Sequence, residues 1–170
     1  MVRAVAIGGA ALAVLASALS DAAVASAEDT AYLFGSCYDP SQPLQEEPQR
    51  VIYGCDSTSI MENMTWSSWG ADGARGAGTD NAVQCRPSCA QGPHLYNPIV
   101  VHAWNPAPGR PGCPDNAAFY TDFTVAYPAG APPWVVPGTS WGPGVEYTYV
   151  DGMPAVHFFD QQPYSCTPLS

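Results

Sequence analysis

Short runs of alternating apolar and polar residues follow one another along this chain, separated by prolines, glycines and turn-forming residues. The clearest run covers residues 119–127 and alternates with a period of two residues. One face of this run would carry Phe119, Thr121, Phe123, Val125 and Tyr127, and the other would carry Tyr120, Asp122, Thr124 and Ala126. This pattern predicts a β-strand whose first face is buried in a core.

Seven such runs predict strands over most of the chain, and residues 32–34 predict an additional edge strand. The seven runs are residues 51–55, 60–69, 79–85, 97–104, 119–127, 145–150 and 155–159. The glycine-rich residues 70–78 predict a wide loop or bulge, and Asp151-Gly152 predicts the turn of a terminal hairpin. No window beyond the first 27 residues shows a helical period. The pattern predicts an all-β sandwich, immunoglobulin-like or similar, with about seven short strands.

A proline-rich segment lies between the last core run and the terminal hairpin. Residues 128–143 hold five prolines together with Trp134 and Trp141. Proline fixes the backbone φ angle and removes a hydrogen-bond donor, so this segment is predicted to be extended and semi-rigid. Its two tryptophans would either serve as binding anchors or cover an open face of the domain.

The first 27 residues have the pattern of a secretory signal peptide. Arg3 precedes an apolar run over residues 4–19, and small residues follow at 25–27. This order is typical of an exported protein whose signal is cleaved, here after Ala27. The alternative is an uncleaved anchor, although the apolar run is short for a membrane span. The sequence predicts a secreted, extracellular protein with no membrane span after cleavage.

The rest of the chain, residues 28–170, is predicted to form a single β domain. Residues 28–50 are an N-terminal arm interrupted by prolines, and residues 51–127 are the core. Residues 128–170 contain the proline- and tryptophan-rich segment and the terminal hairpin. A content of 46% hydrophobic residues favours a packed domain over a disordered chain.

The charge of the chain is strongly acidic. Five Lys and Arg residues stand against 15 Asp and Glu residues, which gives a formal net charge of −10. Nucleic-acid binding requires clustered basic side chains, and an anionic membrane surface attracts the same groups. Nucleic acid and an anionic membrane surface are therefore not predicted as partners. The predicted partner is a protein or an envelope glycan.

Six cysteines lie beyond the predicted signal, at positions 37, 55, 85, 89, 113 and 166. An even number of cysteines in an exported chain predicts disulfides and no free thiol. Six cysteines allow 15 pairings, which the sequence cannot distinguish. Because Cys55, Cys85 and Cys89 lie at the ends of predicted adjacent strands, Cys55 is expected to pair with Cys85 or Cys89.

Three tryptophans are candidate binding residues, namely Trp69, Trp134 and Trp141. Trp66 and Trp69 are three residues apart and would point to opposite faces of a strand. Trp69, next to Gly70, could then form an exposed stacking surface for a sugar or a partner. The alternative interpretation places both side chains in the core or under a loop.

The spacing of the histidines and acidic residues does not match a known catalytic motif. His94, His102 and His157 are scattered, and no Gly-x-Ser-x-Gly motif is present for a hydrolase that would combine a histidine with Asp122 or Asp151. Glu62, Asp122 and Glu146 could supply paired carboxylates for glycoside hydrolysis, but their spacing gives no support. We therefore assign no catalytic residue.

Metal and cofactor sites are weakly supported as well. Asp72 and Asp80 flank the glycine-rich stretch and could hold Ca²⁺, although their spacing matches no EF-hand. The Cys85-x-x-x-Cys89 pair lacks the spacing of a zinc ribbon and the helix start of a catalytic thiol. No metal or cofactor is assigned.

Several short motifs occur in sequence after Cys55. They are Thr65-Trp66-Ser67-Ser68-Trp69-Gly70, Ala74-Arg75-Gly76-Ala77-Gly78-Thr79 and Cys85-Arg86-Pro87-Ser88-Cys89-Ala90-Gln91-Gly92. The combination resembles a family of small exported proteins of actinobacteria, including mycobacteria, without an assigned molecular function. The resemblance covers about residues 51–127 and implies an exported domain with no catalytic residues to transfer. Cys37, Cys113, Cys166 and the proline- and tryptophan-rich segment depart from the pattern.

Taken together, these features predict an exported, non-catalytic β-sandwich protein that binds a protein or a cell-envelope component. The alternative is a small secreted hydrolase acting on cell-wall carbohydrate or ester, with carboxylates beside a tryptophan. The two hypotheses differ in whether substitution of His102, Asp122 or His157 abolishes a measurable turnover.

Overall fold

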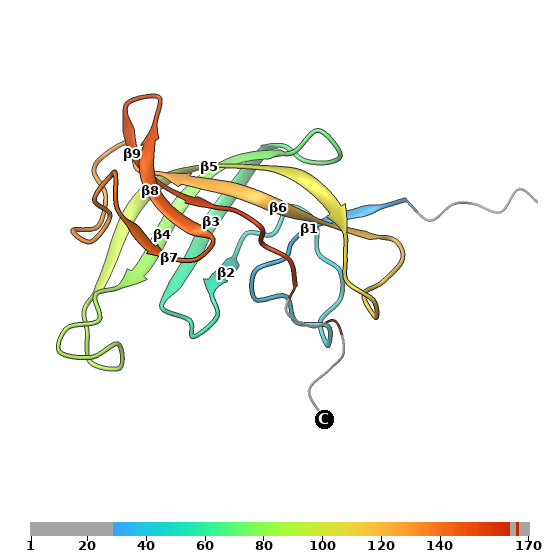
Figure 1. The fold of residues 1–170 in the computed structure, drawn as a ribbon, viewed down its shortest axis with the longest axis horizontal. Coiled ribbons are helices and arrows are strands. Elements are labelled where there is room, and N and C mark those ends of the chain that lie inside the picture. Colours follow the sequence, from blue (N-terminus) through green and yellow to red (C-terminus); the bar gives the residue numbers. More distant parts are fainter. Residues whose placement is uncertain (1–28, 164–165, 167–170) are drawn as a thin grey trace, which may run out of the picture.

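The computed structural model describes residues 29–163 and Cys166, and these residues form nine β-strands without any helix (Figure 1). The strands are β1 (Ala31–Phe34), β2 (Val51–Gly54), β3 (Ser59–Ser68), β4 (Ala74–Val83), β5 (His94–Pro108), β6 (Ala117–Ala126), β7 (Ser140–Gly142), β8 (Val145–Val150) and β9 (Met153–Phe158). The all-β prediction is therefore confirmed. The signal peptide predicted for residues 1–27 lies outside the described residues.

The strands form one continuous sheet instead of the two sheets of the predicted sandwich. Its order is β2-β3-β4-β5-β6-β9-β8-β7, with antiparallel neighbours, and β1 pairs in parallel with the first part of β6. Figure 1 shows this sheet curling, so that β7 and β8 return towards β2 and β3. Bulges increase strand twist and curvature, and the β3–β4 ladder contains two register shifts. A curled sheet buries apolar side chains on its own concave face.

Strand β4 begins earlier than the sequence predicted. Residues 70–78 were expected to form a wide loop or a bulge. No wide loop is present, because only a tight turn precedes β4 and Gly76 and Gly78 lie inside the strand, but two bulges interrupt the ladder of this stretch with β3. A Cβ atom at Gly76 would lie 2.6 Å from the Trp66 ring, and one at Gly78 would collide with the Met64 sulfur. These glycines therefore permit two large side chains of β3 to pack across β4.

The main core lies on the concave face of the sheet and is centred on Phe123 of β6. The Phe123 side chain is fully buried, and its ring stacks on Phe158 of β9 with centroids 4.5 Å apart. Phe119 belongs to a second, smaller cluster, whereas Tyr120 packs in the main core. The prediction that Phe119 and Phe123 share one buried face is therefore wrong. Opposite this point of β6, Asn105 of β5 adopts a left-handed φ of 52°, while the register of the two strands is kept.

Three disulfides connect the cysteines. The bonds are Cys37–Cys55, Cys85–Cys89 and Cys113–Cys166. The predicted pairing of Cys55 with Cys85 or Cys89 is wrong, because the N-terminal arm brings Cys37 to the end of β2, with Cα atoms 5.0 Å apart. Three disulfides are typical of an oxidising, extracellular environment. In the part of the chain that the structure describes, no helix is long and apolar enough to span a membrane.

Candidate functional site

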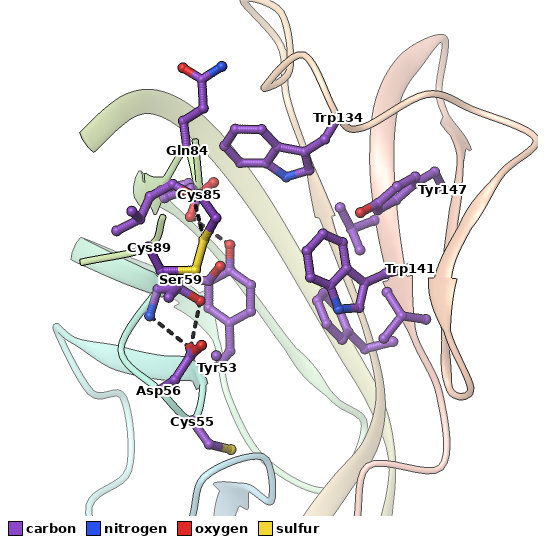
Figure 2. Close-up of a pocket in the computed structure, with 18 of the residues that line it drawn as sticks. Tyr53, Cys55, Asp56, Ser59, Gln84, Cys85, Cys89, Trp134, Trp141 and Tyr147 are labelled. Carbon is purple, nitrogen blue, oxygen red and sulfur yellow. Dashed lines mark hydrogen bonds between the residues drawn. A yellow bond between two sulfur atoms is a disulfide. The ribbon is translucent and has the colours of Figure 1, made fainter. Parts of the chain in front are cut away.

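The concave face of the curled sheet contains a groove with a volume of about 820 Å³. Figure 2 shows Trp134, Trp141 and Tyr147 on one side of this groove, across from Tyr53 and Ser59 on the other. The first wall comes from the proline-rich segment, β7 and β8, and the second from the ends of β2, β3 and β4. The groove therefore lies where the two ends of the sheet approach each other.

The proline-rich segment folds back onto β8, and this positions its tryptophans. It was predicted to be extended, but the Val135 N–H donates to the Pro132 carbonyl at 2.9 Å, which closes a turn around Trp134. The Gly138 N–H donates to the Tyr147 carbonyl at 2.8 Å, and β7 pairs with β8 immediately afterwards. These contacts fix both tryptophans on the same wall.

The three tryptophans proposed as binding residues do not share one environment. Trp141 is 71% exposed at the groove, and Trp134 is half-buried against the main core. Trp69 lies elsewhere: its ring is 4.7 Å from that of Trp66, and its Nε1–H donates to the Tyr32 carbonyl. The prediction that Trp66 and Trp69 point to opposite faces is wrong, because a register shift follows Trp66 and β3 ends before Trp69.

A buried carboxylate lies at the floor of the groove. Asp80 of β4 has no exposed surface, and its two oxygens accept hydrogen bonds from the Tyr53 hydroxyl at 2.6 Å and the Tyr127 hydroxyl at 2.9 Å. Burial raises the pKa of the Asp80 carboxyl, while the two hydroxyl donors act in the opposite direction. Burial also raises the pKa of both phenols, which therefore remain protonated donors.

The Asp80 carboxylate has no cationic partner among the described residues. The ion pairs formed by these residues all involve His157, which lies on the other face of the sheet. Arg86 lines the groove at its exposed rim, where Asp56 accepts hydrogen bonds from the backbone and hydroxyl of Thr58. Two acidic side chains and one basic side chain therefore line this groove, and the buried carboxylate at its floor has two hydrogen bonds but no ion pair.

One rim of the groove is held by the Cys85–Cys89 disulfide (Figure 2). The bond closes a five-residue turn, and the Gln84 N–H donates to the Pro93 carbonyl at 3.0 Å where the chain enters and leaves this loop. The motif considered for redox or metal chemistry thus forms a short covalent loop at the rim.

Several residues considered for catalysis meet on the opposite, convex face of the sheet. The Nδ1 atom of His157 is 3.2 Å from Glu146, and its Nε2 atom is 3.7 Å from Asp122. The Trp104 ring stacks on His157 and also contacts His102, whose pKa is lowered by burial and by nearby Arg75. Among the described residues, no serine hydroxyl hydrogen-bonds His157. The cluster can orient an imidazole, but it shows no nucleophile.

The other candidates lie apart from both features. Glu62 accepts a hydrogen bond from the Asn81 side chain, which also contacts His94. Asp72 is exposed in the turn before β4, whereas Asp80 is committed to two phenols inside the domain. Within residues 29–163 and Cys166, no group of three or more metal-binding side chains is found. The two aspartates therefore do not form the Ca²⁺ site considered from the sequence.

Sequence reasoning did not identify Tyr53 and Tyr127 as site residues, and it considered Asp80 only for calcium. A signal was available in β4, because Asp80 has the same strand parity as Ala82 and would share its inward face. An acidic side chain is rarely fully buried unless it is paired with another group. Comparisons of this chain with protein-family models, with curated proteins and with solved structures find no match in any of the three.

Proposed function

We propose that this chain is an exported, non-catalytic binding protein whose concave groove holds a small organic ligand with an aromatic or apolar face. The observation that carries the proposal is the groove itself, which gathers Trp134, Trp141, Tyr53 and Tyr147 around one space. Such a ligand could be free or could be an accessible part of a cell-envelope component.

The dimensions of the groove favour a small ligand over a folded protein. Its volume of about 820 Å³ falls within the range of roughly 300–1,000 Å³ that is typical of small-molecule sites. A stable protein partner would instead need about 800 Å² of fitted surface on each side. The hypothesis of an envelope component is therefore preferred to that of a protein partner.

The exposed wall of the groove supplies a further argument. Trp141 is 71% exposed, although an indole ring gains free energy when it leaves water. Binding an aromatic or apolar ligand would cover this ring without any change in the fold. The predicted signal peptide, the disulfides and the family resemblance are consistent with a role outside the cell.

Trp141→Ala should weaken binding of 2-phenylethanol, used as a neutral aromatic probe, by about tenfold, because an aromatic contact and its buried area are lost. Thermal stability should change little, since the substituted side chain is exposed. Calorimetric titration measures the affinity, and thermal unfolding measures the stability. Tyr96→Ala is the matched control, because Tyr96 is 62% exposed and does not line the groove.

Two results would contradict the proposed binding function. Equal affinities for the wild type and Trp141→Ala, with a clear loss of melting temperature, would identify Trp141 as a structural residue. The hydrolase alternative rests on the His157 cluster of the convex face. Turnover of chromogenic esters or glycosides that disappears in His157→Ala would replace the binding function by that alternative.

A further inference from the structure

We propose that the groove selects ligands with a protonated nitrogen that carries N–H donors, and that this nitrogen binds the phenol oxygens of Tyr53 and Tyr127 above Asp80. This inference rests on the binding function proposed above and specifies the chemical class of the ligand. It would make the ligand a primary or secondary amine, or an amidine-like group, attached to an aromatic or apolar body.

The hydrogen-bond pattern at the floor leaves only acceptors for a ligand. Each oxygen of Asp80 receives one phenol O–H, so neither hydroxyl hydrogen of Tyr53 and Tyr127 is free. The remaining lone pairs of the two phenol oxygens can only accept. A ligand group that itself accepts hydrogen bonds would leave these lone pairs unsatisfied, whereas an N–H donor would pair with them.

The charge at the floor favours a cation for an independent reason. A buried carboxylate is costly unless an opposite charge compensates it. Asp80 has hydrogen bonds but no ion pair among the described residues, and Arg86 is held at the exposed rim. A bound ammonium group would supply the missing positive charge, whereas Asp56 and Arg86 of the rim have opposite charges that offset each other.

The aromatic walls complete this environment. Trp134, Trp141 and Tyr147 line the groove on the side that faces Tyr53 in Figure 2. The face of an aromatic ring attracts a cation, most strongly for tryptophan. All cations would gain from these rings, but only those with N–H donors would also gain from the phenol oxygens. The two contributions can therefore be separated with matched ligands.

Four probes that share a phenylethyl body test the proposal on the wild-type protein. They are 2-phenylethylamine in its protonated form, trimethyl(2-phenylethyl)ammonium, 2-phenylethanol and 3-phenylpropanoate. The protonated amine should bind about tenfold more tightly than 2-phenylethanol, because hydrogen bonds with a charged partner are the stronger ones. The trimethyl compound should lie between them, and the anion should bind most weakly.

Asp80→Asn tests the source of the preference. This substitution keeps the shape of the side chain, removes its charge and replaces one acceptor oxygen by an N–H donor, which releases one phenol hydroxyl hydrogen. Both changes disfavour the amine, so the affinity ratio of amine to alcohol should fall towards one. Glu146→Gln is the matched control, because it removes one negative charge from the convex face and should retain the ratio. Both variants are measured by calorimetry with the same probes.

Folding of Asp80→Asn is checked by its melting temperature across pH. The neighbours that face Asp80 are Tyr53 from β2, Met61 from β3, Asn97 from β5 and Tyr127 after β6, with Asp56 and Arg86 as the charged groups of the rim. Because burial raises the pKa of Asp80, its stabilising protonated form is lost as the pH rises through the folded-state pKa. The melting temperature of the variant relative to wild type should therefore increase as the pH rises from about 4, the ordinary pKa of an aspartate, through the raised folded-state pKa of Asp80.

The outcomes distinguish the proposed binding function from the proposed preference for protonated amines. If 2-phenylethanol binds and the amine binds no more tightly, the cation preference is overturned and the binding function stands. If the trimethyl compound equals the primary amine, the proposed role of the phenol oxygens is overturned. If none of the probes binds, both are overturned. Should Asp80→Asn fail to fold, the ranking of the four probes on the wild type still decides.

Discussion

Replacing Phe123 with alanine should lower the free energy of unfolding by about 3–5 kcal/mol, since removal of a buried phenyl ring loses transfer free energy and leaves a cavity. The ring has no exposed surface and lies within 5.3 Å of Phe34 and 4.5 Å of Phe158, between centroids. These contacts join β1, β6 and β9. The loss should therefore affect the whole concave core.

Denaturant unfolding of the wild type and Phe123→Ala measures this cost directly. Tyr96→Ala is again the control, because a side chain that is 62% exposed should change the free energy of unfolding by no more than about 0.5 kcal/mol. A loss below about 1 kcal/mol for Phe123→Ala would show that the concave face is not a packed core.

Removal of the Cys113–Cys166 disulfide should cost about 4 kcal/mol, because the bond closes a loop with a sequence separation of 53. In the chain-entropy description, a longer closed loop restricts the unfolded chain more strongly. The bond also covers the second cluster, in which Phe119 is fully buried beside Leu33. Cys113→Ser with Cys166→Ser therefore tests how much this bond stabilises the second cluster.

The Cys85–Cys89 bond provides the control, because its sequence separation is only 4 and the same description gives about 2 kcal/mol. Thermal unfolding of the two double-serine variants compares the bonds under identical conditions. A larger loss for Cys85→Ser with Cys89→Ser than for Cys113→Ser with Cys166→Ser would contradict the expectation that the bond closing the longer loop stabilises the protein more.

Local patterns predicted the individual strands well. Residues 51–55 correspond to β2, and the hairpin predicted around Asp151-Gly152 is formed by β8 and β9. Strand alternation and turn chemistry depend on neighbouring residues, so they can be read from the sequence. The curled single sheet could not be predicted in this way, because the bulges of the β3–β4 ladder depend on how two strands pair with each other.

Long-range contacts explain the remaining differences. Tyr127 donates a hydrogen bond to Asp80 although the two residues are 47 positions apart. Neither their residue types nor their spacing in the sequence predicts this contact. The Cys37–Cys55 pair depends on the path of the N-terminal arm, which contains little regular structure. Trp134 and Trp141 were singled out because proline-rich segments with tryptophan are typical binding elements, and the structure brings both to one groove.

Binding in the concave groove is tested most directly by the indole N–H signals in the NMR spectrum of the ¹⁵N-labelled wild type, titrated with 2-phenylethanol. The signals of Trp134 and Trp141 should shift in a saturable manner, because both rings line the groove. Those of Trp66, whose Nε1–H donates to the Pro48 carbonyl, and of Trp104 on the convex face should remain in place. Saturable shifts confined to Trp66 and Trp104, or no shift at all, would contradict binding in the groove.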